Sequence, residues 1–175
     1  MRIGFTGAQG TGKSTLVDIL VNDVLVGYHR HTNASRILSS ELDNFGINRN
    51  AGFLEQCVIS GSVALDVISN RNLVADRTII DTLAYASNNE NINSYQVHEL
   101  MYKFLAVAEL YDHIFYVPIE FTTEEDGIRD TDDNYRRVID RSIKSLLDIS
   151  GVYYTELNGT VEERLATIKD EIYVY

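Results

Sequence analysis

The sequence predicts an α/β fold in three layers, with helices on both faces of a mainly parallel, five-stranded sheet. Two observations predict it: short apolar segments alternate along the chain with segments of helical periodicity, and a glycine-rich loop joins the first strand to the first helix. Strands that alternate with helices are joined by right-handed crossovers and form parallel sheets. With 175 residues, of which 45% are hydrophobic, the chain is expected to form one domain over residues 1–175.

The five expected strands are short apolar segments. They cover residues 1–6, 28–32, 73–76, 114–117 and 152–157. Pro118, the single proline of the sequence, directly follows the fourth strand and marks its end. In parallel α/β folds, ligands bind beyond the carboxyl ends of the strands. Three segments are therefore expected to meet at one edge of the sheet, namely residues 7–14, residues 76–77 and the loop after Pro118.

The segments between the strands carry apolar residues at helical spacing. We expect helices over residues 13–24, 34–42, 53–69, 79–85, 94–108, 134–149 and 160–172. The apolar residues of the third of these helices are Leu54, Val58, Val63, Leu65 and Ile68. The last helix begins with Thr160-Val-Glu-Glu163, a capping box in which the two terminal side chains bond each other's backbone N–H groups.

Residues 7–14 read Gly-Ala-Gln-Gly-Thr-Gly-Lys-Ser, which matches the phosphate-binding loop pattern G-x-x-x-x-G-K-[ST] between a strand and a helix. Glycine lets the main chain curl so tightly that its N–H groups surround a phosphate. Lys13 would reach the terminal phosphates, and Ser14 would place its hydroxyl on Mg²⁺. The motif predicts that a nucleoside triphosphate is bound by Gly7, Ala8, Gln9, Gly10, Thr11, Gly12, Lys13, Ser14 and Thr15.

Asp76 and Arg77 stand at the end of the third expected strand. In a protein with a phosphate loop, a carboxylate at this place orients Mg²⁺ or accepts a proton from the acceptor, so Asp76 is a candidate metal ligand and catalytic residue. Arg77 would form paired hydrogen bonds with a phosphate or ribose oxygen of the substrate. The alternative is that Asp76 caps a helix and Arg77 lies in solvent.

Asp81 and Tyr85 lie four residues apart, on one face of the helix that follows. Both are candidate substrate ligands, and the ring of Tyr85 would stack on a base. The alternative for Tyr85 is a core position with its hydroxyl at the surface.

The acidic loop after the fourth strand, residues 120–134, is a candidate lid. It carries Arg129 and leads into a helix with Arg136, Arg137 and Arg141. An arginine aimed at the γ-phosphate would stabilise the charge that grows during transfer, and Arg129 is the candidate for this catalytic role. Arg137 and Arg141 are candidate substrate ligands, although acidic residues at helical spacing could pair some of these cations at the surface instead.

Charge and composition disfavour several function classes. The formal net charge of −11 argues against a nucleic-acid partner, so the expected partner is a small molecule. Cys57 is the single cysteine, which leaves no intrachain disulfide or thiolate zinc site and suits a reducing compartment. Because no signal peptide and no apolar segment long enough to span a bilayer is present, we expect a cytoplasmic protein, in the host cytoplasm if it is phage-encoded.

These residues give the chain a resemblance to a group of small P-loop kinases. The group includes the ribosylnicotinamide kinase domain of the bifunctional NAD-biosynthesis regulator and related phage and bacterial nucleoside or nucleotide kinases. The likeness covers most of the chain and depends on residues 7–15, 74–85 and 125–129. It implies ATP with Mg²⁺ as the phosphoryl donor, Asp76 as metal organiser or base, and Arg129 as a lid arginine. The Asp-Arg pair is also similar to that of thymidylate kinases, in which the arginine holds the acceptor's phosphate.

The chain departs from this family in one place. Relatives often carry an acidic residue shortly before an arginine after the second strand, whereas residues 32–36 here read Thr-Asn-Ala-Ser-Arg. The carboxylate that would contact an acceptor hydroxyl at this place is therefore missing from residues 32–36, and Arg36 is a candidate phosphate ligand.

The resulting hypothesis is a kinase that moves the γ-phosphoryl of ATP to a nucleoside monophosphate, with a deoxyribonucleotide favoured. The reason is that Arg36, Arg77 and the lid arginines supply more cations than the donor alone requires. An uncharged, ribosylnicotinamide-like nucleoside and a modified base in DNA are alternative acceptors. A switch or binding module that hydrolyses ATP is the alternative of another class. The acceptor, the preferred triphosphate and the oligomeric state stay open.

Overall fold

The structure of the protein, a computed structural model, describes residues 1–32, 34–120 and 133–173. Its centre is a five-stranded sheet in which every neighbouring pair of strands is parallel. The strands, in the spatial order β2-β3-β1-β4-β5, have the bounds β1 Arg2–Thr6, β2 His29–His31, β3 Leu73–Asp76, β4 His113–Tyr116 and β5 Thr155–Glu156. The predicted fold class and sheet are confirmed.

The helices follow the predicted segments closely. The α-helices are α1 Lys13–Ile19, α2 Ala34–Glu41, α3 Phe53–Ser69, α4 Ile79–Ser87, α5 Ser94–Phe104, α6 Asp133–Ser150 and α7 Val161–Tyr173. Two of the predicted helices change type along their length, since α1 continues as the π-helical turn η1 Leu20–Val24 and α5 as the 3₁₀ turn η3 Leu105–Leu110. A further 3₁₀ turn, η2 Asn48–Asn50, lies between α2 and α3.

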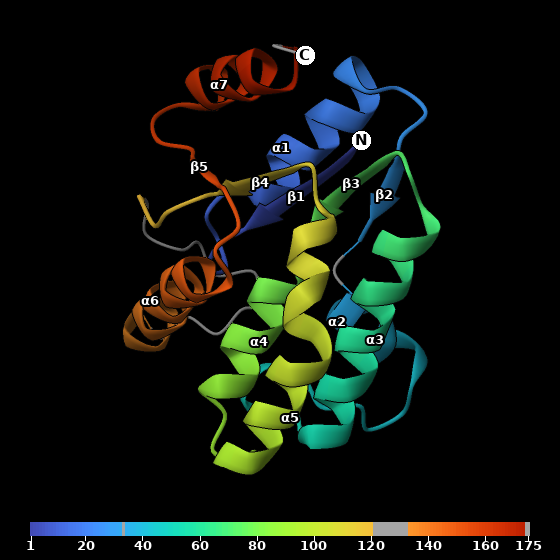
Figure 1. The fold of residues 1–175 in the computed structure, drawn as a ribbon, viewed down its shortest axis with the longest axis vertical. Helices are drawn as coiled ribbons and strands as arrows, with labels where there is room; N and C mark the ends of the chain where they lie inside the picture. Colours follow the sequence, from blue (N-terminus) through green and yellow to red (C-terminus); the bar gives the residue numbers. More distant parts are fainter. Residues whose placement is uncertain (33, 121–132, 174–175) are drawn as a thin grey trace.

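Helices cover the sheet on both faces (Figure 1). On one face, α1 and α7 enclose a core with Phe5 and Phe115 at its centre, whose rings stack at 5.4 Å. On the other face, α3, α4, α5 and α6 share a larger core that includes Leu83, Leu100 and Ile139. Burial of these two apolar faces is the main force that holds the three layers together.

Helix α3 has the predicted bounds but not the face that its largest apolar residues suggest. Four of them are exposed, namely Leu54, Val58, Leu65 and Ile68, with exposed fractions of 75%, 46%, 66% and 61%. The residues that α3 buries are Gln56, Ile59, Ser60, Val63, Ala64 and Val67. The periodicity therefore predicted the helix, whereas contacts with α4 and α5 decided which side faces inward.

The fold brings the ends of three strands together as expected. The backbone N–H of Arg77, just after β3, donates to the carbonyl of Phe5 in β1, and the N–H of Val117, just after β4, donates to the carbonyl of Thr6. Close packing here requires Gly4, because a Cβ at this position would lie 2.5 Å from Cγ2 of Thr78. Within the described part of the chain, we found no helix that combines the length and apolarity needed to cross a membrane.

Candidate functional site

The loop from Gly7 to Gly12 connects β1 to the first turn of α1 and has the backbone that the motif predicts. Gly10 and Gly12 adopt left-handed conformations with φ of 70° and 93°, and Gly12 is the N-cap of α1. At Gly7, a Cβ would lie 2.3 Å from the carbonyl oxygen of Val117. Side chains at these positions would therefore strain or block the turn that aims backbone N–H groups at a ligand.

Lys13 lies folded against this loop. Its Nζ donates to the carbonyls of Gly7 and Ala8, at 2.8 and 2.5 Å, and to the Thr11 hydroxyl at 3.1 Å. Burial, followed by the positive charge of Arg77, lowers the pKa of Lys13 to about 7, although Asp81 and Asp76 act in the opposite direction. A phosphate near Nζ would restore the charged form, because a nearby negative charge favours an ammonium.

Ser14 and Asp76 lie side by side, as the metal prediction requires. The hydroxyl of Ser14 donates to Oδ2 of Asp76 at 2.6 Å, and the carboxyl group of Asp76 is largely buried at the end of β3. Two hard oxygen donors are suitable for Mg²⁺, which usually completes its shell with waters and substrate phosphates. Among the described residues, no cluster of three or more acidic, histidine or cysteine side chains could hold a metal by itself. Ser14 and Asp76 therefore fit a Mg²⁺ ion that arrives with a polyphosphate.

Asp81, on the first turn of α4, connects the loop to the second motif. Its Oδ2 accepts from the backbone N–H and the hydroxyl of Thr78, at 2.9 and 3.2 Å, and its Oδ1 accepts from the N–H of Gly7 at 3.2 Å. Oδ1 also lies 3.4 Å from Nη1 of Arg77. These contacts position the loop and Arg77, so the predicted direct contact of Asp81 with substrate stays a prediction.

Arg77 adopts an unusual backbone conformation, with φ at 89°. Its guanidinium lies between Oδ1 of Asp81 and the ring of Tyr85, whose centroid is 5.2 Å from Cζ. Burial opposes the positive charge, but Tyr85, Asp81 and Asp76 outweigh it and keep the pKa of Arg77 above its ordinary value. A charged arginine in a strained turn is a feature typical of functional sites.

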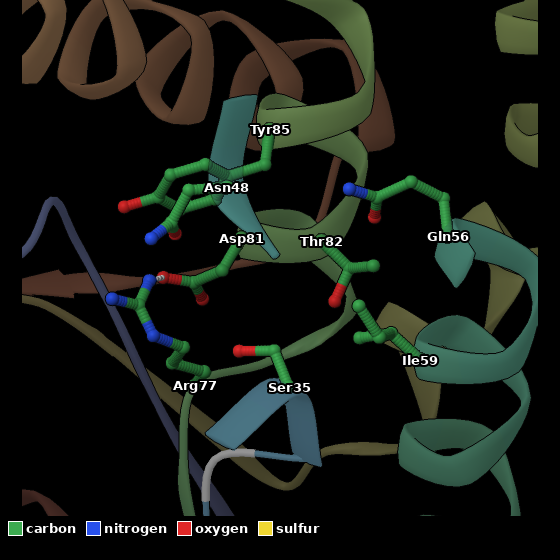
Figure 2. A pocket seen from close by; sticks show the side chains of 8 residues that line it. All are labelled: Ser35, Asn48, Gln56, Ile59, Arg77, Asp81, Thr82 and Tyr85. Atoms are coloured by element: carbon green, nitrogen blue, oxygen red, sulfur yellow. Dashed lines mark hydrogen bonds and ion pairs between the residues drawn. The ribbon is translucent and has the colours of Figure 1, made fainter. Parts of the chain in front are cut away.

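An open pocket lies beside these residues, and its empty space together with the solvent at its mouth amounts to about 340 Å³. Figure 2 shows Arg77 and Gln56 reaching it from opposite sides, with Tyr85 above and Ser35 below. Its lining comes from α2, η2, α3, the turn between β3 and α4, and α4 itself, and consists of Ser35, Asn48, Gln56, Ile59, Arg77, Asp81, Thr82 and Tyr85. Three residues predicted to bind substrate, Arg77, Asp81 and Tyr85, are thus brought together.

The hydroxyl of Tyr85 donates to Oε1 of Gln9 in the phosphate loop at 2.7 Å. The loop and the pocket are therefore in direct contact. The stacking of the Tyr85 ring on a base stays a prediction.

Gln56 is a pocket residue that the sequence analysis missed. Its side chain is 2% exposed, and its Oε1 has no hydrogen-bond partner among the described residues. An unsatisfied buried amide oxygen costs about 1–3 kcal/mol, so its retention at a pocket points to a ligand that donates to it. The signal in the sequence was a polar residue on the same helical face as Ile59, Val63 and Val67.

Arg136 of α6 and Arg164 of α7 were also missed as site residues. They are 1% and 2% exposed and donate to backbone carbonyls of the phosphate loop. Arg136 falls on the same buried helical face as Ile139 and Ile143, which distinguishes it in the sequence from its neighbour Arg137.

Other predicted ligands are not brought to the pocket. Arg36, Arg137 and Arg141 are exposed and do not line it, so their contacts with substrate stay predictions. Thr15 is exposed on α1. Arg129 and most of the predicted lid over 120–134 lie outside the described residues.

Comparisons with known proteins agree with this architecture. A family model described as "AAA domain" matches residues 2–164. The structure of a deoxyadenosine kinase from M. mycoides with dCMP and dCDP superposes with a TM-score of 0.70 at 13% identity, over 98% of both chains. The structure of the NadR protein in complex with NR superposes with a TM-score of 0.74 at 17% identity, over 99% of this chain and 50% of the NadR chain.

A thymidylate kinase from Candida albicans gives a TM-score of 0.68 at 15% identity, over 97% of this chain and 89% of the other. At such identities these similarities show a shared fold. No curated protein matches the sequence.

Proposed function

Because the chain belongs to the AAA domain family and places a phosphate loop beside an open pocket, we propose that it is an ATP-dependent kinase for a nucleoside monophosphate. ATP with Mg²⁺ is the donor, and the acceptor occupies the pocket between α2, α3 and α4. The proposal is supported by neighbours of the same fold that are named as a deoxyadenosine kinase and as thymidylate kinases.

One observation carries the choice of a monophosphate over an uncharged nucleoside. A nucleoside hydroxyl needs a general base within hydrogen-bond reach, whereas a phosphate oxygen is already negatively charged at neutral pH. Asp81 is the one carboxylate among the described lining residues, and it already accepts from Gly7, Thr78 and Arg77. A pocket lining without a further general base is suited to an acceptor whose attacking oxygen is already negatively charged.

The residues would divide the chemistry as follows. Lys13 neutralises the transferring phosphoryl group, and Arg77 binds the acceptor's phosphate through its guanidinium. Ser14 and Asp76 hold Mg²⁺, which when bound neutralises charge on the donor's phosphate oxygens. Asp81 fixes the position of Arg77 relative to the phosphate loop, because its carboxylate accepts hydrogen bonds from both.

Gln56 would read the base. A primary amide presents one acceptor and two donors, which matches a base edge that carries an N–H next to a ring nitrogen or a carbonyl. Its place across the pocket from Arg77 gives the acceptor an orientation, with the phosphate at Arg77 and the base at α3. Both ends of a nucleoside monophosphate then find complementary groups.

The test is a panel of acceptors incubated with Mg²⁺ and ATP labelled in the γ-phosphoryl group. The panel contains the four deoxynucleoside monophosphates, the ribonucleoside monophosphates, nucleosides and duplex DNA. We expect label on one or more monophosphates, with deoxyribonucleotides preferred, and no label without acceptor. Label on nucleosides or on DNA alone would replace the proposed acceptor. Release of free phosphate alone would favour an ATP-hydrolysing switch and contradict the kinase.

A further inference from the structure

Two buried arginines lie on the outer side of the phosphate loop. Nε of Arg136 donates to the carbonyl of Gln9 at 2.8 Å, and its Nη2 to that of Gly10 at 3.3 Å. Nη1 of Arg164 donates to the carbonyl of Thr11 at 2.8 Å. The two side chains come from α6 and α7, more than 120 residues away along the chain.

With these bonds, each carbonyl from Gly7 to Gly12 has a donor. Lys13 donates to the carbonyls of Gly7 and Ala8, and the two arginines donate to the next three carbonyls. The N–H of Leu16 donates to the carbonyl of Gly12. A loop that turns its N–H groups toward a ligand turns many of its carbonyls outward, where burial would leave them unsatisfied. The arginines remove this cost on the side away from the ligand.

Satisfying carbonyls does not by itself require a cation, since a neutral amide or hydroxyl would also donate. Burying a charge is costly unless it is paired, and both arginines have carboxylate neighbours. Arg164 contacts Glu120 at 2.6 Å, and Arg136 lies 3.5 Å from Asp133, which is half exposed. Two buried guanidinium groups therefore keep positive charge close behind the loop that would hold a polyphosphate.

We propose that Arg136 and Arg164 are positioning residues that hold the phosphate loop in its anion-binding shape before the nucleotide arrives. They act through the carbonyls of Gln9, Gly10 and Thr11 and need not touch the ligand. This role rests on the proposed use of the loop for ATP. Its effect is on binding, so it can be measured without any acceptor.

The experiment compares Arg136→Gln and Arg164→Gln with Lys144→Gln and Lys169→Gln. The control lysines are exposed on the same two helices and lose the same charge. For the full chain, calorimetry gives the affinity for MgATP and for inorganic tripolyphosphate, and hydrogen exchange reports the amides of residues 7–14. Circular dichroism verifies that each variant is folded.

We expect each arginine variant to lose at least about tenfold in affinity for both ligands, with faster exchange confined to the loop. In steady state the KM for ATP should rise more than kcat falls. The lysine variants should stay within about twofold of the wild type. Folded arginine variants with wild-type affinity and loop exchange would overturn the proposal.

If a glutamine variant does not fold, Arg136→Lys and Arg164→Lys are judged by the same criteria. Lysine keeps the charge but lacks the planar fork of arginine. Failure of the wild type itself to bind MgATP would instead contradict the proposed function, so the two proposals fail in different ways.

Discussion

The phosphate loop and the neighbouring pocket differ in how completely their polar groups are paired. In the loop from Gly7 to Gly12, each carbonyl has a donor before any ligand is present. In the pocket, Oε1 of Gln56 has no partner among the described residues. The loop is thus preorganised for a ligand common to many enzymes, whereas the pocket is completed by its own ligand. Substitutions in the loop should change the rate of phosphoryl transfer, and substitutions in the pocket should change the preferred acceptor.

The largest effect is expected for Lys13→Ala. Under the proposed function the Lys13 ammonium neutralises the transferring phosphoryl group, so its loss should lower kcat about 10²- to 10³-fold. The measurement is labelled phosphoryl transfer under saturating acceptor, with Lys169→Ala as a control for the loss of a surface charge. Near wild-type transfer by folded Lys13→Ala would show that the loop is not where the chemistry occurs.

Arg77→Ala and Arg77→Gly should both raise the KM for the acceptor about 10²-fold, since each removes the guanidinium from the pocket. The two variants should differ in stability. Glycine tolerates the φ of 89° that alanine adopts with strain, so the glycine variant should be more stable by about 1 kcal/mol.

Urea unfolding gives the stability of the two Arg77 variants and steady-state kinetics gives the KM. Equal stability of the two variants would mean that the turn at Arg77 holds no strain. An unchanged KM would remove Arg77 from the acceptor site.

Gln56→Leu should mainly alter the choice of acceptor. Losing the carboxamide removes about 1–3 kcal/mol of discrimination between bases, or roughly 5- to 150-fold in the ratio of kcat/KM values. The affinity for MgATP should not change. Leu54→Gln, on the exposed side of the same helix, is the matched control. If Gln56→Leu kept the wild-type order of acceptors, the base would have to be read elsewhere.

The smallest effect is a pH dependence of ATP binding. Lys13 has a pKa of about 7 without ligand, and a bound triphosphate should raise it. Above pH 7 the free protein loses this proton while the complex keeps it, so binding takes up a proton and weakens as pH rises. We expect about a fivefold loss of affinity from pH 7 to pH 8.

Calorimetry in buffers of different ionisation enthalpy measures this proton uptake. Lys13→Arg, whose charge does not titrate in this range, should show only the titration of ATP itself. Equal proton uptake by the two proteins would rule out Lys13 as the titrating group.

The two regions also differ in how well the sequence predicts them. The loop is a contiguous motif between a strand and a helix, and its glycines and Lys13 were predictable from local pattern. That Ser14 and Asp76 lie close together agrees with the expectation that the strand ends meet at one edge of the sheet. The sheet and the helix bounds followed from periodicity for the same reason. The pocket is assembled from α2, η2, α3 and α4, and no spacing rule places Gln56 opposite Arg77.

The residues that were missed act through contacts across the fold. Arg136 and Arg164 reach the loop from 127 and 153 residues away, and only their position on apolar helical faces distinguishes them from surface arginines. Helix α3 shows the same limit, because large apolar residues mark a helix but do not decide which side its neighbours cover.

The four contacts of Asp81 have a consequence for how such a protein can diversify. One carboxylate links Gly7 to Arg77, so a change at this position should disturb the phosphate loop and the proposed acceptor site at once. Gln56, Ser35 and Asn48 stand on α3, α2 and η2, and none of the four hydrogen bonds of Asp81 described above goes to them. Under the proposed function, new acceptor preferences should therefore arise by mutation of these three residues without a change in the link between the phosphate loop and Arg77.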